Sequence, residues 1–390
     1  MRFGALWVVV FGVGCVPRAY ISVLEPADVA LPNHIETLAV MDRSRPANAG
    51  QGILGTIEGA LTGEAIGADR EAGREAVRGL VETVEASPRF EVVVPPFDRS
   101  ESNLFDRELS WKTVRRICKD YDAQALVSLE ALDSDSWVQE DSYVETDTDD
   151  HGREVRRKVF TAQRETRIMS AWRVYDVRDD SLLDDLRDYA MADTWEAEGH
   201  NPAEARQHLP PLFDTVVSVG YESGLAYGRR IAPTWVNVQR SYFGGGDPRM
   251  VEAKRHVKAD DWEGAESLWR EITKEADPKM RGKAEFNTAL ALEVRGKLHK
   301  ALEMAKKAAV DLHNFRSRNY ITILEMRILD QQRLRDQMAT PKPKPEQIPG
   351  PHPTPDLAVP ADDRLERPEP EDGKLERPEP EDGKLERPEE

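Results

Sequence analysis

A glycine-rich segment is the first part of the sequence that could support chemistry. Gly50-Gln51-Gly52-Ile53-Leu54-Gly55 has the spacing of a dinucleotide-binding turn, in which glycines let the backbone approach a pyrophosphate. In that motif the glycines follow a strand directly and open into a helix. Here the segment from Asp42 to Ala49 separates them from the preceding strand-like run. The motif also has an acidic residue at the end of the next strand, whereas the next apolar run here ends in Pro95-Pro96. The sequence therefore favours a glycine loop over a nucleotide site.

An acidic segment in the middle of the chain resembles half of a calcium-binding loop. Asp147-Thr148-Asp149-Asp150-His151-Gly152 begins with the expected spacing of carboxylates. However, His151 stands at the fifth position, and Lys158 stands at the twelfth position, where a bidentate glutamate is needed. We therefore expect a solvated hairpin tip, because Asp and Gly favour turns.

The other residue types that carry catalysis are present without a catalytic pattern. No pair of histidines has a metal-binding spacing, and Gly220-Tyr221-Glu222-Ser223-Gly224 is one position out of register with a nucleophile elbow. The many carboxylates define no acid–base pair without a pocket. We therefore expect a protein that is not an enzyme, with no catalytic residue, metal ligand or cofactor.

The composition narrows the classes of protein further. The chain has 390 residues, enough for two or three domains, and its formal net charge is −18. An excess of negative charge argues against a general nucleic-acid binder, which needs a positive face to meet phosphates. Cys15 and Cys118 are the only cysteines, so the sequence holds no disulfide framework. Cys118 has the spacing of a helix core residue.

The amino terminus reads as an export signal. Arg2 precedes an apolar run from Phe3 to Gly14, which is short for a membrane span and fits the core of a signal peptide. The small residue before Cys15 resembles the bacterial lipobox, although Gly12 stands where that pattern prefers leucine. The resemblance implies that Cys15 is the lipidated first residue of the mature chain, and Val16 after it implies sorting to the outer membrane. The alternatives are an ordinary secretory signal or an apolar first helix.

The apolar patterns in the first two thirds of the chain predict an α/β domain. The expected elements are a strand at 35–41, a helix at 68–84, a strand at 90–94, a helix at 111–121 and a strand at 125–129. An antiparallel meander follows, with strands in 155–177 and 182–195. We then expect one long helix over 202–230. Its glycines at 220, 224 and 228 lie on one face and permit close approach to the sheet or a neighbouring helix.

The region from 250 to 312 predicts two helical hairpins of one type. Ala253 and Ala289 are 36 positions apart, and so are Ala265 and Ala301. A period near 34, with small residues where helices cross, is typical of tetratricopeptide repeats. Such repeats bind proteins in a concave groove, although they also serve as scaffold extensions with no ligand. We expect a capping helix over 320–334 and contact between the repeats and the α/β domain.

The composition changes abruptly after Thr340. Thirteen of the 26 prolines lie beyond this residue, and the segment RPEPEDGKLE occurs twice in succession. Such a sequence cannot form a core, so we expect a disordered tail with extended polyproline stretches. The tail is a spacer, a weak partner motif or a dispensable low-complexity segment.

Four segments together resemble known envelope proteins. They are HIETLAVMDRS, LVETVEASPRFEVV, YDAQALVSLEAL and AWRVYDVRDDSLLDD. Their order is similar to the α/β domain of the curli-secretion lipoprotein, the penicillin-binding-protein activator lipoprotein and the amino-terminal domain of the Tol-system translocation protein. The chain as a whole resembles uncharacterised bacterial lipoproteins that join such a domain to tetratricopeptide-like repeats. The resemblance implies an envelope location and protein binding, and it supplies no catalytic residues.

These observations give the following expectation. The fold class is α+β: a lipoprotein signal peptide with lipidated Cys15 (1–15), a linker (16–34), an α/β sandwich-type domain with a mixed sheet (35–232), a helical repeat domain (233–336) and a disordered tail (337–390). The expected function is that of a non-enzymatic scaffold, held on the periplasmic face of the outer membrane by lipid, that binds protein partners through its repeats or its sheet edge. We expect neither nucleic acid nor a small-molecule substrate among its partners. The alternative is a subunit of an outer-membrane secretion or pore-forming assembly similar to the curli-secretion lipoprotein, with 137–159 as the membrane-inserting segment. The charges of that segment speak against it.

Overall fold

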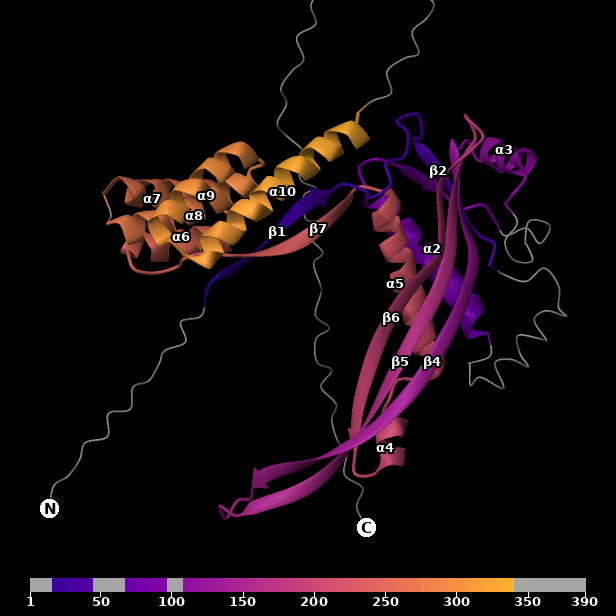
Figure 1. The fold of residues 1–390 in the computed structure, drawn as a ribbon, viewed down its shortest axis with the longest axis horizontal. Helices are drawn as coiled ribbons and strands as arrows, with labels where there is room; N and C mark the ends of the chain where they lie inside the picture. Colours follow the sequence, from indigo (N-terminus) through magenta and orange to yellow (C-terminus); the bar gives the residue numbers. More distant parts are fainter. Residues whose placement is uncertain (1–15, 45–66, 97–107, 276, 340–390) are drawn as a thin grey trace, which may run out of the picture.

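The computed structural model describes residues 16–44, 67–96, 108–275 and 277–339 and has two limbs, which meet near the end of the last helix (Figure 1). One limb is a mixed sheet with helices on it, and the other is a set of antiparallel helices. This arrangement confirms the predicted fold class. Cys15, the glycine segment Gly50–Gly55 and the residues from 340 onward lie outside the described residues.

The sheet has five strands in the order β3-β2-β4-β5-β6. Their bounds are β2 Thr37–Asp42, β3 Glu91–Val93, β4 Ala125–Thr148, β5 Glu154–Asp176 and β6 Ser181–Gly199. β2 runs parallel to β3 and β4, whereas β4, β5 and β6 form an antiparallel meander. Each predicted strand is present, but β4 and β5 are far longer than any apolar run in the sequence.

Helices cover the two faces of the sheet where it is apolar. Because side chains alternate along a strand, Leu38 and Val40 face helices α2 (Ala68–Glu85) and α5 (Leu212–Ile231). Ala39 and Met41 face the other side, where α3 (Trp111–Asp120) packs and Cys118 is buried. The expectation that Cys118 is a core residue is confirmed.

The predicted long helix over 202–230 is two helices, α4 (Pro202–Gln207) and α5. Pro210 and Pro211 separate them, because proline disfavours helical backbone in the residue before it and lacks the N–H that a helix interior needs. The face of α5 that carries the three glycines lies against α2. A side chain at Gly224 would place its Cβ atom 1.8 Å from the carbonyl oxygen of Ala76. The close approach predicted for these glycines is therefore confirmed.

Two strands that the sequence analysis missed join the limbs. β1 (Arg18–Glu25) lies in the segment predicted to be a linker, and it pairs antiparallel with β7 (Thr234–Ser241) along its whole length. The prediction of a linker over 16–34 is therefore wrong for β1 and for Leu31, which is buried in the core of the α/β domain. β1 is amphipathic, but its partner is more than 200 residues away, so local sequence could not reveal the pairing.

The helical limb consists of α6 (Pro248–Lys258), α7 (Trp262–Glu275), α8 (Pro278–Val294), α9 (Leu298–Leu312) and α10 (Phe315–Gln337). The predicted antiparallel helices and the capping helix are confirmed. The four alanines that define the 36-residue period are fully buried, as close helix crossings require. Asp247 and Asp277 cap α6 and α8, each with a proline at the first helical position.

The β1–β7 ribbon packs on these helices. Ile21 and Val23 of β1 share one apolar core with Val236 and Val238 of β7 and with residues of α6, α7 and α8. α8 is buried almost all round, which is unusual for a helix in a two-repeat array. The ribbon thus belongs to the helical limb, and it covers apolar surface of α6 and α8 that a short repeat array leaves open.

Candidate functional site

The most exposed structural feature is a two-stranded arm, formed by residues 141–159 at the far end of β4 and β5 (Figure 1). The last pair between β5 and β6 joins Phe160 to Gly199, so the arm projects beyond the sheet. On its other side, β4 pairs with β2 only as far as Leu129. Within the part of the chain that the structure describes, the β4 edge from Ala131 to Thr148 is therefore open, and both edges of the arm are open.

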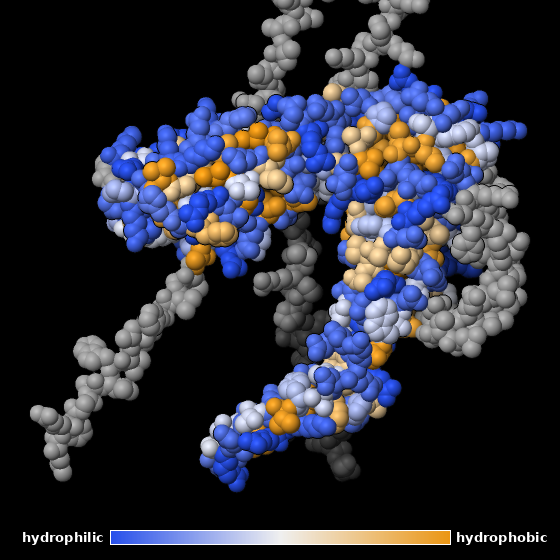
Figure 2. Space-filling model, viewed as in Figure 1, coloured by the Kyte–Doolittle hydropathy of each residue, from blue (hydrophilic) through white to orange (hydrophobic). Residues whose placement is uncertain are grey.

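The arm carries charged and apolar side chains on both faces. Along one face Tyr143, Glu145 and Asp147 alternate with the residues of the other face, which include Val144. Figure 2 shows mostly hydrophilic residues along the arm, with a few apolar ones among them. Val144 is 62% exposed and Val155 47% exposed, which is high for apolar residues in a strand. Exposed valine and tyrosine among charges are typical of a polar protein contact, not of a lipid-facing surface.

Weak contacts at the surface hold the arm in shape. Arg157 pairs with Glu145 across the strands at 2.6 Å, and the Tyr143 hydroxyl donates to Glu198 of β6 at 2.7 Å. Exposed ion pairs of this kind add little stability, and an isolated two-stranded hairpin is marginally stable in water. Among the described residues, the outer backbone groups of the arm therefore have no strand partner, and the arm has little stabilisation of its own.

The tip of the arm includes the segment that resembled a calcium loop. The backbone N–H and the guanidinium of Arg153 both donate to Asp149, and these bonds hold the pKa of that carboxyl below its usual range. His151 donates its backbone N–H to the same carboxylate at 2.9 Å. The described residues contain no cluster of three side chains that could hold a metal ion. The predicted hairpin tip is confirmed.

A cluster of buried charges lies at the carboxyl end of β2, where its parallel pairing with β4 ends, and this is the edge at which open α/β sheets bind ligands. The Glu130 carboxylate accepts from Arg43 and from the Tyr175 hydroxyl, and Arg173 pairs with Asp185 at 3.0 Å. The side chains of Arg43 and Arg173 are only 2% exposed. Regular alternation from Leu126 places Glu130 on the face of the sheet that carries Tyr175, and the register between β4 and β5 is irregular at this residue.

The chemistry of this cluster is that of a structural network. Burial and the Glu130 carboxylate raise the pKa of Tyr175 to about 12, so its hydroxyl stays protonated at neutral pH. That hydroxyl donates to Glu130 and accepts the backbone N–H of Leu109, at 3.1 and 3.2 Å. The sequence analysis missed these residues, since Glu130 and its partner Arg43 lie 87 positions apart in the sequence.

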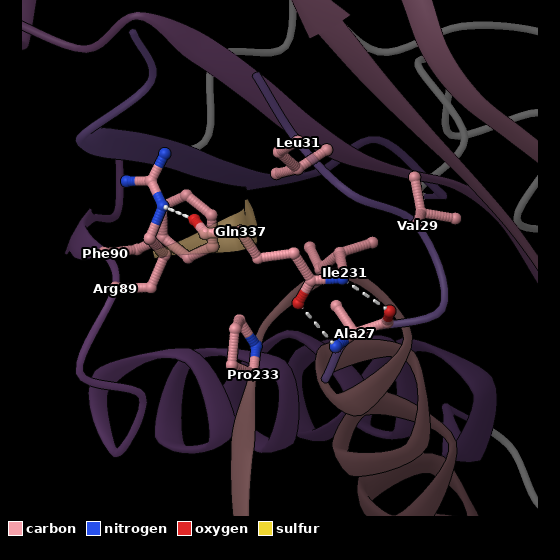
Figure 3. Close-up of a pocket in the computed structure, with 8 residues that line it drawn as sticks. All are labelled: Ala27, Val29, Leu31, Arg89, Phe90, Ile231, Pro233 and Gln337. Carbon is pink, nitrogen blue, oxygen red and sulfur yellow. Dashed lines mark hydrogen bonds between the residues drawn. The ribbon is translucent and has the colours of Figure 1, made fainter. Parts of the chain in front are cut away.

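The two limbs meet at a narrow hollow (Figure 3). The side chain of Gln337 points to the backbone of Ala27, and Arg89 donates to the backbone carbonyl of Gln337 at 2.9 Å. The lining residues are apolar apart from Arg89 and Gln337, and the space between them admits no water molecule. The hollow is a joint between the limbs and offers no room for a ligand. The expected contact between the helices and the α/β domain is made here.

A second buried network fixes the ribbon to the helices. Glu293 of α8 is 3% exposed. Its carboxylate accepts from Arg240 of β7 at 2.9 Å, from Arg327 of α10 at 3.1 Å and from the Tyr320 hydroxyl at 2.7 Å. Burial and this carboxylate raise the pKa of Tyr320 well above its usual value. Three elements distant in sequence are thereby joined at one carboxylate.

The remaining predicted positions are placed as follows. Trp172, Trp262 and Trp269 are core residues, as expected, and Trp195 is partly buried beside α4. Cys15, the predicted lipidation site, lies outside the described residues, and the first described residues after it are Val16 and Pro17. No helix of the described chain is long and apolar enough to cross a membrane.

Comparison with known proteins gives two family matches. Residues 35–243 match the family described as a domain of unknown function (DUF8603), and residues 251–326 match a second domain of unknown function (DUF6340). The search of curated proteins gave no match. The first match covers the sheet limb together with β7, and the second covers most of the helical limb. Since the first model spans more than half of the sequence, the chain belongs to the DUF8603 family.

Proposed function

We propose that this protein is a non-enzymatic lipoprotein of the bacterial cell envelope that binds a protein partner along the open edge of its arm. The observation that carries the proposal is the β4 edge from Ala131 to Thr148, which pairs with no other strand of the described residues and continues into the two-stranded arm. An open strand edge presents N–H and C=O groups that an extended segment of another chain can pair with. Such pairing would supply the stabilisation that the arm itself lacks.

The side chains of the arm would set the specificity of this pairing. In strand addition the main chain provides affinity, and alternate side chains select the partner. Tyr143 lies between Asp141 and Glu145 on one face of the arm, whereas Val144 lies between Ser142 and Thr146 on the other face, opposite Lys158. We therefore propose a partner strand with basic residues on the side that meets the Tyr143 face.

The repeat surface is a weaker candidate than the arm. The sequence analysis assigned partner binding to the helical repeats or to the sheet edge. The β1–β7 ribbon packs on α6 and α8 through Ile21, Val23 and Val236, and Asn287 of α8 bonds the backbone of Phe243. An incoming peptide would have to displace this ribbon. The sheet edge therefore has the stronger support.

A pore-forming role has no supporting observation. Membrane-spanning strands need one uniformly apolar face about ten residues long. In the arm, Glu145 and Arg157 occupy one face, and Arg156 and Lys158 occupy the other. Neither face would be stable against lipid, so we do not assign the arm to a membrane.

The tether in this proposal is an acyl group on Cys15. It is supported by the resemblance of the amino terminus to the lipobox and by an apolar run of signal-peptide length. Labelling producing cells with an alkyne fatty acid tests it: the wild type and Cys118→Ser should be labelled, and Cys15→Ser should not. Equal labelling of Cys15→Ser, or none of the wild type, would contradict the tether.

Shortening the arm tests partner binding. In the test variant, Asn-Gly replaces residues 143–159, and this two-residue turn joins Ser142 to Phe160, which are paired in the wild type. The matched control keeps the arm and changes the exposed ion pair of another loop, Arg115→Gln with Asp180→Asn. We expect complexes extracted from producing cells in mild detergent to become smaller only with the short arm. Unchanged complex size after shortening would contradict the proposal.

A further inference from the structure

The amino-terminal end of the helical limb forms a surface that we define by six residues, Val16, Arg18, Lys254, Lys283, Phe315 and Arg316, and call the entry surface. We infer that the entry surface faces and binds the anionic headgroups of phospholipids when the protein is tethered. This inference rests on the proposed acyl tether at Cys15. The surface is assembled at the end of the helices where α6, α8 and α10 begin.

The chain is fixed at this surface directly after the proposed anchor. The backbone N–H of Tyr242 donates to the carbonyl of Pro17 at 3.0 Å, and β1 pairs with β7 from Arg18 onward. Cys15 precedes Pro17 by two positions in the sequence, and two residues of chain reach about 7 Å at most. An acyl chain on Cys15 would therefore bring the bilayer surface to this end of the limb, with no slack to hold it away.

The glycine segment 244–246 gathers basic side chains around that point. A Cβ atom on Gly244 would lie 2.6 Å from Pro17 and 3.7 Å from Lys254, and one on Gly246 would lie 3.7 Å from the Lys283 amine. The Arg316 guanidinium lies 4.3 Å from the ring centre of Phe243, directly before these glycines. The entry point of the chain is thus next to three cations, with Arg18 as a fourth at the start of β1.

These four cations have no carboxylate partner among the described residues, whereas three nearby carboxylates, those of Asp247, Asp277 and Asp311, have partners of their own. Asp247 pairs with Arg249 at 3.0 Å, and Asp311 pairs with Arg281 at 2.7 Å. Asp277 accepts the first backbone N–H groups of α8. Arg316 is partly buried at this surface: its guanidinium packs on the rings of Phe243 and Phe286, and two of its nitrogens are buried without a hydrogen-bond partner. The surface therefore presents positive charge that the protein does not neutralise.

The net charge of the helical limb supports the same orientation of the protein, with this limb towards an anionic membrane. Residues 233–339 hold 20 Lys and Arg against 16 Asp and Glu, although the chain as a whole has a net charge of −18. Basic residues close to a membrane are attracted by anionic lipids. An acidic protein tethered at a basic end is oriented with its acidic sheet limb away from the anionic surface.

Phe315 adds an apolar contact. It is 76% exposed at the first position of α10, between the Asn314 cap and Arg316. Aromatic residues beside basic ones are preferred where protein meets the headgroup region of a bilayer. Val16 is also half exposed and lies next to the proposed anchor. The combination fits a phospholipid interface better than a small free anion, which has no apolar part.

Vesicle co-sedimentation tests the entry surface without the acyl group. The chain from Val16 to Glu390 contains every residue that the structure describes. Vesicles of phosphatidylcholine with 30% phosphatidylglycerol are compared with pure phosphatidylcholine. We expect binding to the former only, weakened by salt. Lys254→Gln with Lys283→Gln should lower the affinity about 30-fold, since each basic residue near the surface contributes about 1 kcal/mol.

The matched control removes the same charge at the opposite end of the antiparallel helices. Lys258 and Lys300 are exposed and lie where α6 ends and α9 begins, away from the glycine segment. Lys258→Gln with Lys300→Gln should leave vesicle binding within twofold of the wild type. Phe315→Ser should weaken binding without changing its salt dependence. Equal losses in both lysine pairs, or no preference for phosphatidylglycerol, would overturn the inference.

The outcome separates this inference from the tether. If Cys15 is labelled by the fatty acid but the protein shows no preference for vesicles with phosphatidylglycerol, the tether is supported and lipid binding by the entry surface is contradicted. Selective vesicle binding without labelling at Cys15 would remove the tether, and with it the orientation inferred here. Circular dichroism of each variant keeps unfolding from being mistaken for lost binding.

Discussion

The side chain of Gln337 bonds both backbone groups of Ala27: its amide N–H donates to the Ala27 carbonyl at 2.9 Å, and its amide oxygen accepts the Ala27 N–H at 3.0 Å. Gln337 is the last residue of α10, and Ala27 follows β1, so 310 positions separate them. Ala27 is 1% exposed, so its backbone groups depend on this side chain and on Arg333. The relative position of the two limbs depends on this pair and on the bond from Arg89.

Truncation of the Gln337 side chain should weaken the contact between the two limbs. In Gln337→Ala the N–H of Ala27 loses its partner in a buried place, and we expect the free energy of unfolding to fall by about 2 kcal/mol. The Ala27 amide should exchange with solvent faster than in the wild type. Urea unfolding and hydrogen exchange measure these effects. Gln332→Ala, on the exposed side of α10, is the control, and an equal loss in both variants would contradict the assignment.

A methyl group at Gly224 should separate α2 from α5. Its Cβ would lie 1.8 Å from the backbone oxygen of Ala76, a distance that only a backbone shift can relieve. We expect Gly224→Ala to destabilise the protein by about 3 kcal/mol or more, since overpacking against backbone has no flexible atom to move. Gly245→Ala should be nearly neutral, because nothing lies within 4 Å of its Cβ position. A urea midpoint for Gly224→Ala equal to that of Gly245→Ala would contradict the packing.

Neutralising Glu293 should destabilise the helical limb. Glu293→Gln leaves Arg240 and Arg327 without their shared carboxylate in a largely buried place, and breaking a buried pair in this way costs about 3–5 kcal/mol. Tyr320→Phe removes one neutral donor from the same carboxylate and should cost less. Glu303→Gln, on exposed α9, is the control. The loss in free energy of unfolding should be largest for Glu293→Gln, smaller for Tyr320→Phe and smallest for Glu303→Gln. A loss for Glu293→Gln no larger than that for Glu303→Gln would contradict the assignment.

The Cys118 thiol should react only after unfolding. Burial raises its pKa from 9.0 to about 12, and the Asp176 carboxylate adds to the effect. Because the folded pKa is raised, this thiol contributes stability that is fully present below pH 9 and is lost as the pH rises towards 12. In the chain from Val16, a chromogenic disulfide reagent at pH 8 should find no thiol in the native protein and one in urea. Rapid reaction of the native protein would contradict the burial of Cys118.

Particular residues show what the sequence could and could not predict. The helical limb was predictable because its signals are local: alanines at a fixed period, and Asp-Pro at two helix starts. The β2, α2 and α3 elements were predictable from apolar patterns for the same reason. The β1–β7 ribbon was not, since the partner of Ile21 is Val238. The arm was not predictable in length, because its strands have no continuous apolar face and are set by cross-strand pairing.

Among the candidate sites, too, the features set by local sequence were predictable, and those set by long-range contacts were not. The hairpin tip at Asp149 was predicted from turn residues, which act locally. The networks around Glu130 and Glu293 were missed because each gathers residues from elements far apart in sequence. The sequence analysis named a sheet edge as a binding surface but could not locate it on β4, because an edge is defined by the end of pairing with β2, and no residue type marks it.

Photo-crosslinking from the arm, in cells that produce the full chain, tests the central claim most directly. A benzophenone amino acid replaces Val144 on the arm or, as the control, Tyr121 at the end of α3, which is also exposed. The account predicts a discrete crosslinked product from position 144 in the membrane fraction and none from position 121. No product from position 144, or the same products from both positions, would contradict a partner bound along the β4 edge.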